Sequence, residues 1–421
     1  MKLFTELGAL IESRWRSNNY QEESFPGIAA QALFEFKLLE RTDPWQIIRW
    51  LHTTPHLPEQ MDLDSVFGDP PITLYVGPRF YIDAYYWLDG TTSIHQHSFS
   101  GAFQLLMGSS VHSRYRFENQ HEINPRFLIG DIRLNDVSLL SKGDIREIVA
   151  GPQLIHSLFH LERPSVTITV RTYKAPSMPV QYTYRKPSIA YDPFFKDHLV
   201  SKQVQTVGLL LKMKHPETDE MIGALLDAAD FQTTYVILER AFETLCHREL
   251  ETLLGLSKSS ERFQALLDRA RARHGEFAER LLPVLEERWR QNDIARRRDQ
   301  IKGEDHRFFM ALLLNVPDRT TVLRLIKERY PESDAVELVV DWVRELATTK
   351  VFGSHEPNVL GIGEFDEHHL LVLRQLLAGR ALAEIEALVA ANPSSAAVST
   401  PSVRELVDHI KALPPFRSLF N

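Results

Sequence analysis

The feature that most constrains the fold is a block of short strand-like runs in the middle of the chain. Between residues 72 and 184, runs rich in β-branched and aromatic side chains alternate with turn residues roughly every ten positions, as in an all-β sandwich or barrel. The predicted strands are residues 72–76, 79–88, 102–107, 111–117 and 166–173. The predicted turns are residues 77–78, 89–90, 135–136, 142–144 and 151–152.

Helical periodicity dominates on both sides of this block. Asp43 and Pro44 fit a helix cap followed by a proline in the first turn. The segment 391–402, rich in Ala, Ser and Pro, is predicted to be a flexible linker. Further helices are predicted at residues 218–230, 235–254, 260–274, 276–299, 305–314, 320–330, 333–346, 382–391 and 403–413. We therefore expect an α+β protein made of a helical N-terminal arm (1–60), a β-barrel domain (61–187) and a large all-helical domain (188–421).

Composition narrows the functional classes. The net charge of −8 does not favour a nucleic-acid partner. The single cysteine, Cys246, excludes an internal disulfide framework and a multi-thiolate metal site, and we expect it to be a buried thiol. The first residues lack a signal-peptide pattern, and no run of about 18 uncharged apolar residues predicts a membrane span. We expect a cytoplasmic protein, and any homodimer is expected to form through the helical domain.

Three histidines in the β region are the strongest chemical signal. His95 and His97 are two residues apart, so on a strand their side chains lie on one face. His156 follows a Gly-Pro turn on a later strand-like run. Neutral imidazoles that share a face can chelate one divalent metal, and they suit iron, nickel, zinc or copper. The pattern predicts a mononuclear metal site; the alternative is three histidines on a polar barrel face.

The spacing around these histidines resembles the two motifs of the cupin superfamily of small β-barrels. The first motif places a glycine before His-x-His, then a glutamate and a second glycine; the second places a Pro/Gly turn before the third metal histidine. The matching residues are Gly90, His95, His97, Gly108, Gly151, Pro152 and His156. The resemblance covers residues 72–173, roughly a quarter of the chain.

The glutamate of the first motif, a usual fourth ligand in cupins, falls on Gly101. A three-histidine site without this carboxylate resembles that of the thiol dioxygenases, of which cysteine dioxygenase is the familiar member. Of that family's Ser-His-Tyr series, which would fall on Thr169, Arg171 and Tyr173, only the tyrosine matches. The resemblance implies a barrel that binds Fe(II), with Ni, Zn, Mn or Cu as alternatives, and that reacts a small molecule with dioxygen.

The strand around residues 165–173 supplies two candidate catalytic residues. It alternates a polar face, which carries Arg171 and Tyr173, with an apolar one. If the polar face lines the barrel lumen, Arg171 is an anion anchor near the metal with Tyr173 beside it. If that face meets solvent, both are merely exposed strand residues.

Two further candidate site residues, Tyr85 and His160, can each be interpreted in two ways. Tyr85, with Tyr81 and Trp87 on its face, either walls a substrate pocket or packs under the N-terminal helices. His160 is either a base or ligand near the metal or a surface histidine at a strand end. Two further side chains are considered for a place near the metal, namely Gln104 and His112.

Two charged clusters in the helical half are assigned no chemistry. The arginines 296–298 lie among acidic residues and are predicted to form a solvated helix face. The residues 366–369 are two acids followed by two histidines, and adjacent side chains on a helix would diverge by about 100°. A single metal site there is therefore not expected.

The three histidines, read with this resemblance, imply a mononuclear non-haem iron oxygenase of the three-histidine type. Its substrates are expected to be dioxygen and a small amino-acid-like, thiol or organic-acid molecule, in specialised metabolism. The first alternative is a non-oxidative metal cupin, a lyase or isomerase, in which the metal acts as a Lewis acid. The second alternative is a non-catalytic ligand-binding or interaction protein.

Overall fold

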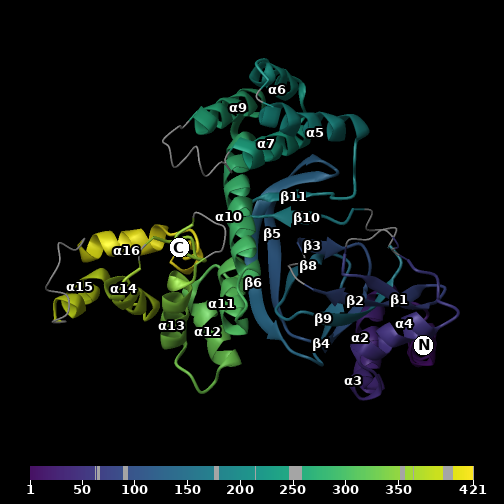
Figure 1. The fold of residues 1–421 in the computed structure, drawn as a ribbon. Coiled ribbons are helices and arrows are strands. Elements are labelled where there is room, and N and C mark those ends of the chain that lie inside the picture. The colour runs from purple at the N-terminus through teal and green to yellow at the C-terminus, as the bar shows by residue number, and fades with distance from the viewer. Residues whose placement is uncertain are drawn as a thin grey trace.

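The protein is described by a computed structural model in which helices flank a central β region (Figure 1). The α+β class predicted from the sequence is confirmed. The predicted turn at 89–90, Cys246 and nearly all of the predicted linker lie outside the described residues. The structure describes residues 1–61, 63, 67–88, 93–174, 180–213, 215–245, 258–350, 356–363, 365–391 and 402–420.

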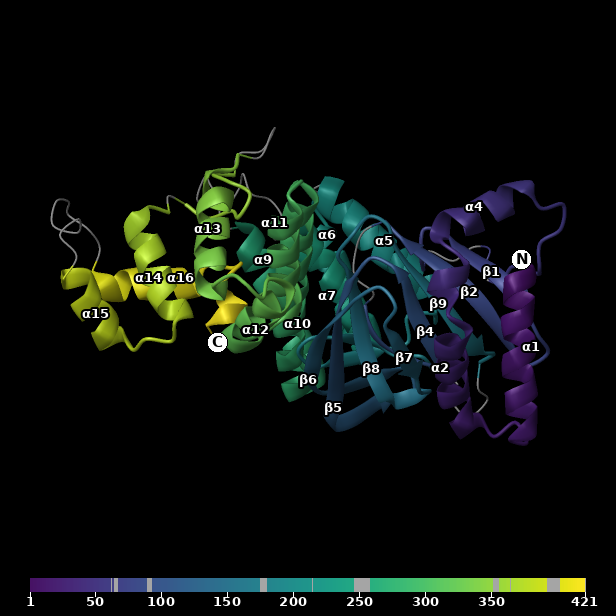
Figure 2. The same cartoon turned by 90° about the horizontal axis from the view of Figure 1, so that it is seen from below.

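The N-terminal arm is helical, as predicted. It contains α1 (Lys2–Ser17), the 3-10 turn η1 (Glu22–Ser24), α2 (Phe25–Phe36), α3 (Leu38–Arg41) and α4 (Pro44–Thr53). The helix α4 begins where the sequence indicated, because the Asp43 carboxylate accepts a hydrogen bond from the backbone N–H of Gln46 at 2.9 Å. These helices lie together at one end of the molecule (Figure 2).

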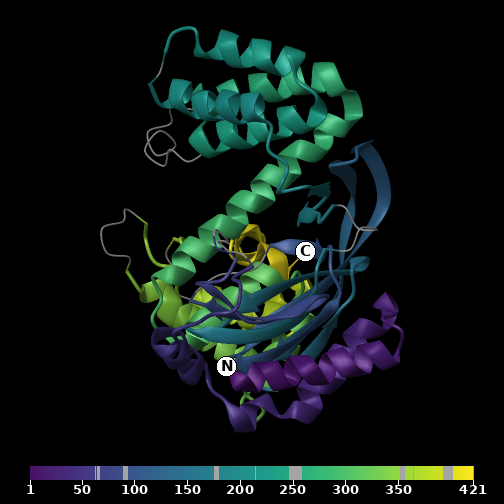
Figure 3. The same ribbon diagram turned by 90° about the vertical axis from the view of Figure 1, so that its right-hand side faces the viewer.

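The arm covers one face of a five-stranded sheet (Figure 3). The strand order is β1-β2-β9-β4-β7. The bounds are β1 Pro71–Val76, β2 Phe80–Trp87, β9 Ser165–Thr172, β4 Gly101–Met107 and β7 Ile145–Ile148. Apolar side chains of β2 and β9, including Ile82, Ala84 and Val170, form one core with Phe4 and Trp15 of α1. This packing turns the opposite, polar face of β2 and β9 towards the interior of the β region.

The remaining strands close into a barrel with the order β10-β11-β6-β5-β8-β3. The bounds are β3 Ile94–His97, β5 Ser110–Asn124, β6 Phe127–Leu140, β8 Gly151–His160, β10 Thr183–Arg185 and β11 Ile189–Tyr191. The predicted turn at Asn135-Asp136 is wrong, because these residues continue β6 and Asp136 pairs with Arg114 of β5. Since β11 pairs with β6, the barrel extends to Tyr191, past the expected boundary at 187.

The helices after the barrel form two groups joined by one long helix, α10 (Leu281–Asp299), which runs along β5 and β6 (Figure 1). The first group has α5 (His198–Met213), α6 (Thr218–Ala228), α7 (Phe231–Leu245), α9 (Lys258–His274) and the turn η2 (Gly275–Arg280). The second has α11 (Glu304–Asn315), α12 (Arg319–Arg329), α13 (Ala335–Thr348), α14 (Glu367–Leu377), α15 (Leu382–Ala390), α16 (Val403–Ala412) and the turn η4 (Arg417–Leu419). None of the helices within the described ranges has the length and apolar character needed to cross a bilayer.

The predicted solvated face at residues 296–298 is wrong for two of its three arginines. Arg297 is 9% and Arg298 2% exposed. Arg298 donates to the backbone carbonyl of Leu161 at 3.2 Å, and its guanidinium lies 4.7 Å from the ring centroid of Phe159. Both partners belong to the end of β8 and the residue after it, so these contacts fasten α10 to the barrel. The burial depends on a long-range contact that local charge patterning does not reveal.

Candidate metal centre

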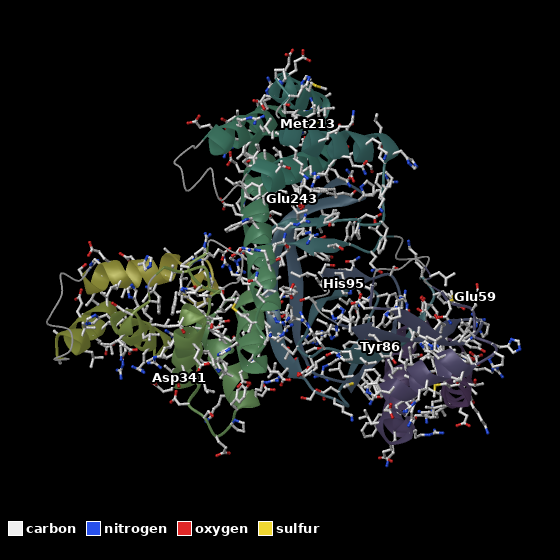
Figure 4. The ribbon with its side chains drawn as sticks, viewed as in Figure 1. Glu59, Tyr86, His95, Met213, Glu243 and Asp341 are labelled. Carbon is white, nitrogen blue, oxygen red and sulfur yellow. The ribbon has the colours of Figure 1, made fainter. Side chains whose placement is uncertain are left out.

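The three predicted ligands meet inside the β region. His95 and His97 lie on β3, and His156 on the antiparallel neighbour β8, directly opposite His95. One ligand atom of each lies within 4.8 Å of the other two, and all three side chains are buried. The Nε2 atoms of His97 and His156 are 2.8 Å apart. Figure 4 places His95 in the middle of the molecule, and the predicted convergence of the three histidines is confirmed.

The geometry and charge state of these imidazoles fit a divalent metal. Two nitrogens bound at about 2.1 Å and at a right angle would be about 3 Å apart, close to the observed Nε2 separation. The Nδ1 of His95 lies 2.6 Å from the carbonyl oxygen of Ser93, which fixes the Nδ1–H tautomer and leaves Nε2 as the ligand atom. Burial lowers the pKa of His95, His97 and His156, so all three are neutral and can donate a lone pair.

A fourth histidine, His112, is in hydrogen-bond contact with one of the three predicted ligands. The Nε2 of His112 on β5 lies 2.9 Å from the Nδ1 of His156. Burial lowers the pKa of His112 to about 4, so it is neutral and can accept the Nδ1–H of His156. This contact orients His156 with its Nε2 towards the other two ligands. Sequence reasoning gave His112 little weight, because only the pairing of β5 with β8 brings it beside His156.

Gly101 explains why the usual carboxylate ligand is missing. It is paired with Arg171 across β4 and β9. A Cβ atom built on Gly101 would lie 2.0 Å from the carbonyl oxygen of Val170, which no side chain tolerates. The two strands are therefore too close for an acidic residue at this position. The site therefore lacks a carboxylate ligand at this position for two reasons. The sequence has glycine where the motif has glutamate, and the backbone packing leaves no room for a larger residue.

A cavity of about 730 Å³ lies against the histidines. Its wall includes Thr167, Thr169 and Arg171 of β9, so the polar face of that strand lines the lumen. It also includes Tyr85 and Trp87 of β2, so these two aromatic residues face the cavity. The remaining aromatic wall residues are Phe67, Phe99, Phe103 and Phe194. The cavity is large enough for a small organic molecule, and its mostly apolar wall carries two cationic side chains, Arg171 and the exposed Lys196.

Arg171 is held in place by aromatic residues and by a short polar chain. Its guanidinium carbon lies 3.5 Å from the ring centroid of Phe99, and Nη1 donates to the Tyr85 hydroxyl at 3.4 Å. The Tyr85 hydroxyl in turn donates to Asp83 Oδ2 at 2.9 Å. Arg171 Nε is buried without a hydrogen-bond partner in the described structure. An anionic ligand in the cavity would offer this guanidinium the partner it lacks.

Other candidate residues lie elsewhere. Tyr173 follows the end of β9, and its hydroxyl donates to the Gly77 carbonyl at 2.8 Å, away from the cavity wall. Gln104 faces away from the lumen and donates to the Gly143 carbonyl at 3.1 Å. His160 is 1% exposed, so the surface reading is wrong. It is stacked on Trp87, with ring centroids 4.5 Å apart, and does not line the cavity.

His160 is expected to make stability depend on pH. Its Nδ1 lies 3.0 Å from the Ser110 hydroxyl, and burial lowers its pKa from 6.5 to about 3. Between these values the unfolded chain binds the proton and the folded one does not, so the stability present above pH 6.5 is lost as pH falls. We expect His160→Gln to reduce the slope of the unfolding free energy against pH by up to about 1.4 kcal/mol per unit.

Urea unfolding of the metal-free protein at several pH values between about 7 and 4 measures this slope. His52→Gln, at an exposed position on α4, is the matched control and should leave the slope unchanged. Equal slopes for the parent and His160→Gln would show that His160 does not stay neutral in the fold.

Comparisons with known proteins give fold-level similarity only. No family model and no curated protein matches the chain. Similar solved structures include KdgF from Halomonas sp., at 15% identity over 26% of this chain and 81% of that one, with a TM-score of 0.18. A hydroquinone 1,2-dioxygenase from Sphingomonas sp. TTNP3, solved with 4-hydroxybenzoate bound, has 10% identity over 27% and 70%, with a TM-score of 0.21. An RmlC-like cupin from Shewanella frigidimarina has 11% identity over 29% and 94%, with a TM-score of 0.20.

The two sequence motifs that resemble those of cupins lie on paired strands of the β region. The strands β3 and β8 belong to a closed barrel and pair with each other. The histidines of both motifs converge at that pairing, within a buried cluster. The central part of the chain is therefore a closed barrel that carries a three-histidine cluster, the arrangement that the resemblance to cupins implied.

Proposed function

We propose that the protein is a mononuclear non-haem metal oxygenase that acts on a small anionic substrate. One observation carries the proposal: the cavity combines three neutral imidazoles with the largely buried guanidinium of Arg171, and the described residues of its wall include no carboxylate. Three neutral ligands leave the charge of a divalent ion uncompensated. An anionic substrate would balance that charge and pair with Arg171 at the same time.

The same wall supports an oxidative reaction over a lyase or isomerase reaction. A non-oxidative cupin needs a general base beside the substrate. The imidazoles of the cavity are directed at the metal position, and burial raises the pKa of the Tyr85 hydroxyl, which makes it a poor base at neutral pH. Within the described part of the wall, no Asp or Glu can take this role. An oxygenase that receives its substrate as an anion needs no such base.

Each part of the cavity has a role in this proposal. His95, His97 and His156 would hold the ion, for which Fe(II) is our first expectation, and the ion would supply the activation of dioxygen. Arg171 binds the anionic group of the substrate, and Tyr85, fixed by Asp83, holds Arg171 in position. The rings of Trp87, Phe99 and Phe103 pack against the substrate body and exclude water. In a dioxygenase reaction both oxygen atoms enter the substrate, so no external reductant is consumed.

Oxygen uptake tests the proposal. Protein loaded anaerobically with Fe(II) is mixed with air-saturated solutions of mercapto acids, amino acids or hydroxybenzoates, and oxygen is followed with an electrode. We expect uptake that matches substrate loss, and label from ¹⁸O₂ in the product. Zn(II)-loaded protein is the matched control and should be inactive, because zinc has no redox chemistry. Turnover by the zinc form or without oxygen, or no uptake with any substrate class, would contradict the proposal.

A further inference from the structure

A second, smaller cavity lies outside the barrel, behind the strand that carries His95. Its volume is about 200 Å³. One side is the outer wall of the barrel, with Ser157 of β8 and Arg185 of β10, and the other side is formed by α10 and the end of α11. It is therefore formed by the packing of the helices against the barrel, at the place where α10 passes the strands (Figure 1).

The wall of this cavity is strongly cationic. It contains Arg185, Lys186 and Arg288, and its described residues include no Asp or Glu. Arg288 is balanced by an ion pair with Glu239 of α7. Arg185 and Lys186 have no ion-pair partner in the described chain: Arg185 Nη2 donates to the Tyr191 hydroxyl at 3.2 Å, and Lys186 Nζ lies 5.0 Å from the ring centroid of Tyr115. The positive charge of Arg185 is thus left without a carboxylate partner in the described chain, whereas Lys186 lies close enough to Glu287 of α10 to interact with it electrostatically.

One donor in this wall is also unsatisfied. Arg185 Nε is buried and has no hydrogen-bond partner in the described structure. A buried N–H of a charged group that lacks an acceptor costs free energy, and more so when no anion is near. The same wall offers the hydroxyl of Ser157 and the amide of Asn292 as further polar groups. The arrangement of guanidinium, ammonium and neutral donors is that of an oxyanion receptor.

We propose that this cavity binds a small oxyanion, in a site separate from the metal cavity. The volume admits a phosphate or sulfate ion with a few waters, or a short carboxylate. The two sites are neighbours, because Ser93 lines both cavities and its carbonyl oxygen lies 2.6 Å from His95 Nδ1. The oxyanion site thus adjoins the residue that orients a metal ligand. This inference does not depend on the proposed oxygenase activity.

Calorimetric titration of the metal-loaded protein tests the site with three anions: inorganic phosphate, sulfate and succinate. We expect one of them to bind, and the tightest one identifies a tetrahedral oxyanion or a carboxylate as the ligand. Asn292→Asp adds a carboxylate to the wall at an exposed position on α10, and should raise Kd about tenfold or more without removing a cation. Arg185→Gln should have a similar effect, because a charged hydrogen bond is lost.

Two controls keep the site distinct from the metal cavity. Arg171→Gln removes the guanidinium of the metal cavity, and Lys196→Gln removes its exposed ammonium; neither residue lines the second cavity, so both variants should keep the anion affinity within about twofold. Melting curves confirm that each variant is folded. Affinity lost in Arg171→Gln but kept in Asn292→Asp would assign the anion to the metal cavity and overturn the inference. So would the failure of all three anions to bind the parent at millimolar concentrations.

Discussion

Metal content is expected to fall from about one ion per chain to near zero when His97 is replaced by alanine. His97 Nε2 lies 2.8 Å from His156 Nε2, so its loss opens one side of the ligand set. Replacing a residue that only hydrogen-bonds to a metal ligand lowers metal affinity by about 10–100-fold. Replacing the ligand His97 itself should lower the metal affinity by more than that. Elemental analysis of protein purified without added metal measures the content.

His52→Ala, at an exposed histidine on α4, is the matched control and should keep the parent metal content. Because His97 is buried, the fold of the variant is checked by circular dichroism before the metal is measured. A folded His97→Ala protein that retains one ion per chain would remove the central assignment of this site, and with it the proposed oxygenase activity.

Arg171→Gln is expected to raise KM for the anionic substrate by about a hundredfold or more. Glutamine preserves most of the side-chain length and can still hydrogen-bond to Tyr85, but the positive charge is gone. Truncating one partner of a buried charge pair costs about 2–5 kcal/mol, which corresponds to factors of about 30 to several thousand. Steady-state oxygen uptake over a range of substrate concentrations gives KM and kcat separately.

Lys196→Gln provides the comparison within the same cavity. Lys196 lines the wall but is exposed, so solvent screens its charge and KM should change by less than about threefold. Arg171→Lys should recover part of the affinity, because the charge returns without the planar fork. Equal KM values for the parent and Arg171→Gln would show that the guanidinium is not the anion anchor.

The metal ligands were predictable because they depend on local rules. Two residues apart on a strand means one shared face, and His156 was identified from the second motif, although Gly151 and Pro152 belong to β8 and Gly151 pairs with His97 instead of forming the predicted turn. The orientation of β9 was not predictable in this way, since alternation alone does not say which face is inside. Its apolar face, with Val166, Ile168 and Val170, is buried under the N-terminal helices, so both faces of the sheet are covered. Which face of β9 lies inside therefore depends on where the N-terminal arm packs against the sheet.

The other misplacements also arise from long-range packing. The surface alternative for His160 fails because Trp87 of β2 covers its ring. Arg298 was read as solvated because acids surround it in sequence, but α10 lies against the barrel. The helix α5 was missed because Val200, Val204, Val207 and Gly208 weaken its local helical signal. For His160 and Arg298 the deciding partner lies far away in the sequence.

The close approach of β4 and β9 at Gly101 limits how this protein could change. Any single mutation that introduces aspartate or glutamate there meets the backbone of the neighbouring strand before its carboxylate reaches the histidines. Adding a carboxylate ligand at this position would require the two strands to move apart. That movement would also displace Arg171, whose backbone pairs with Gly101. The ligand number and the proposed preference for negatively charged molecules are thus coupled, and evolution or protein engineering has to alter both together.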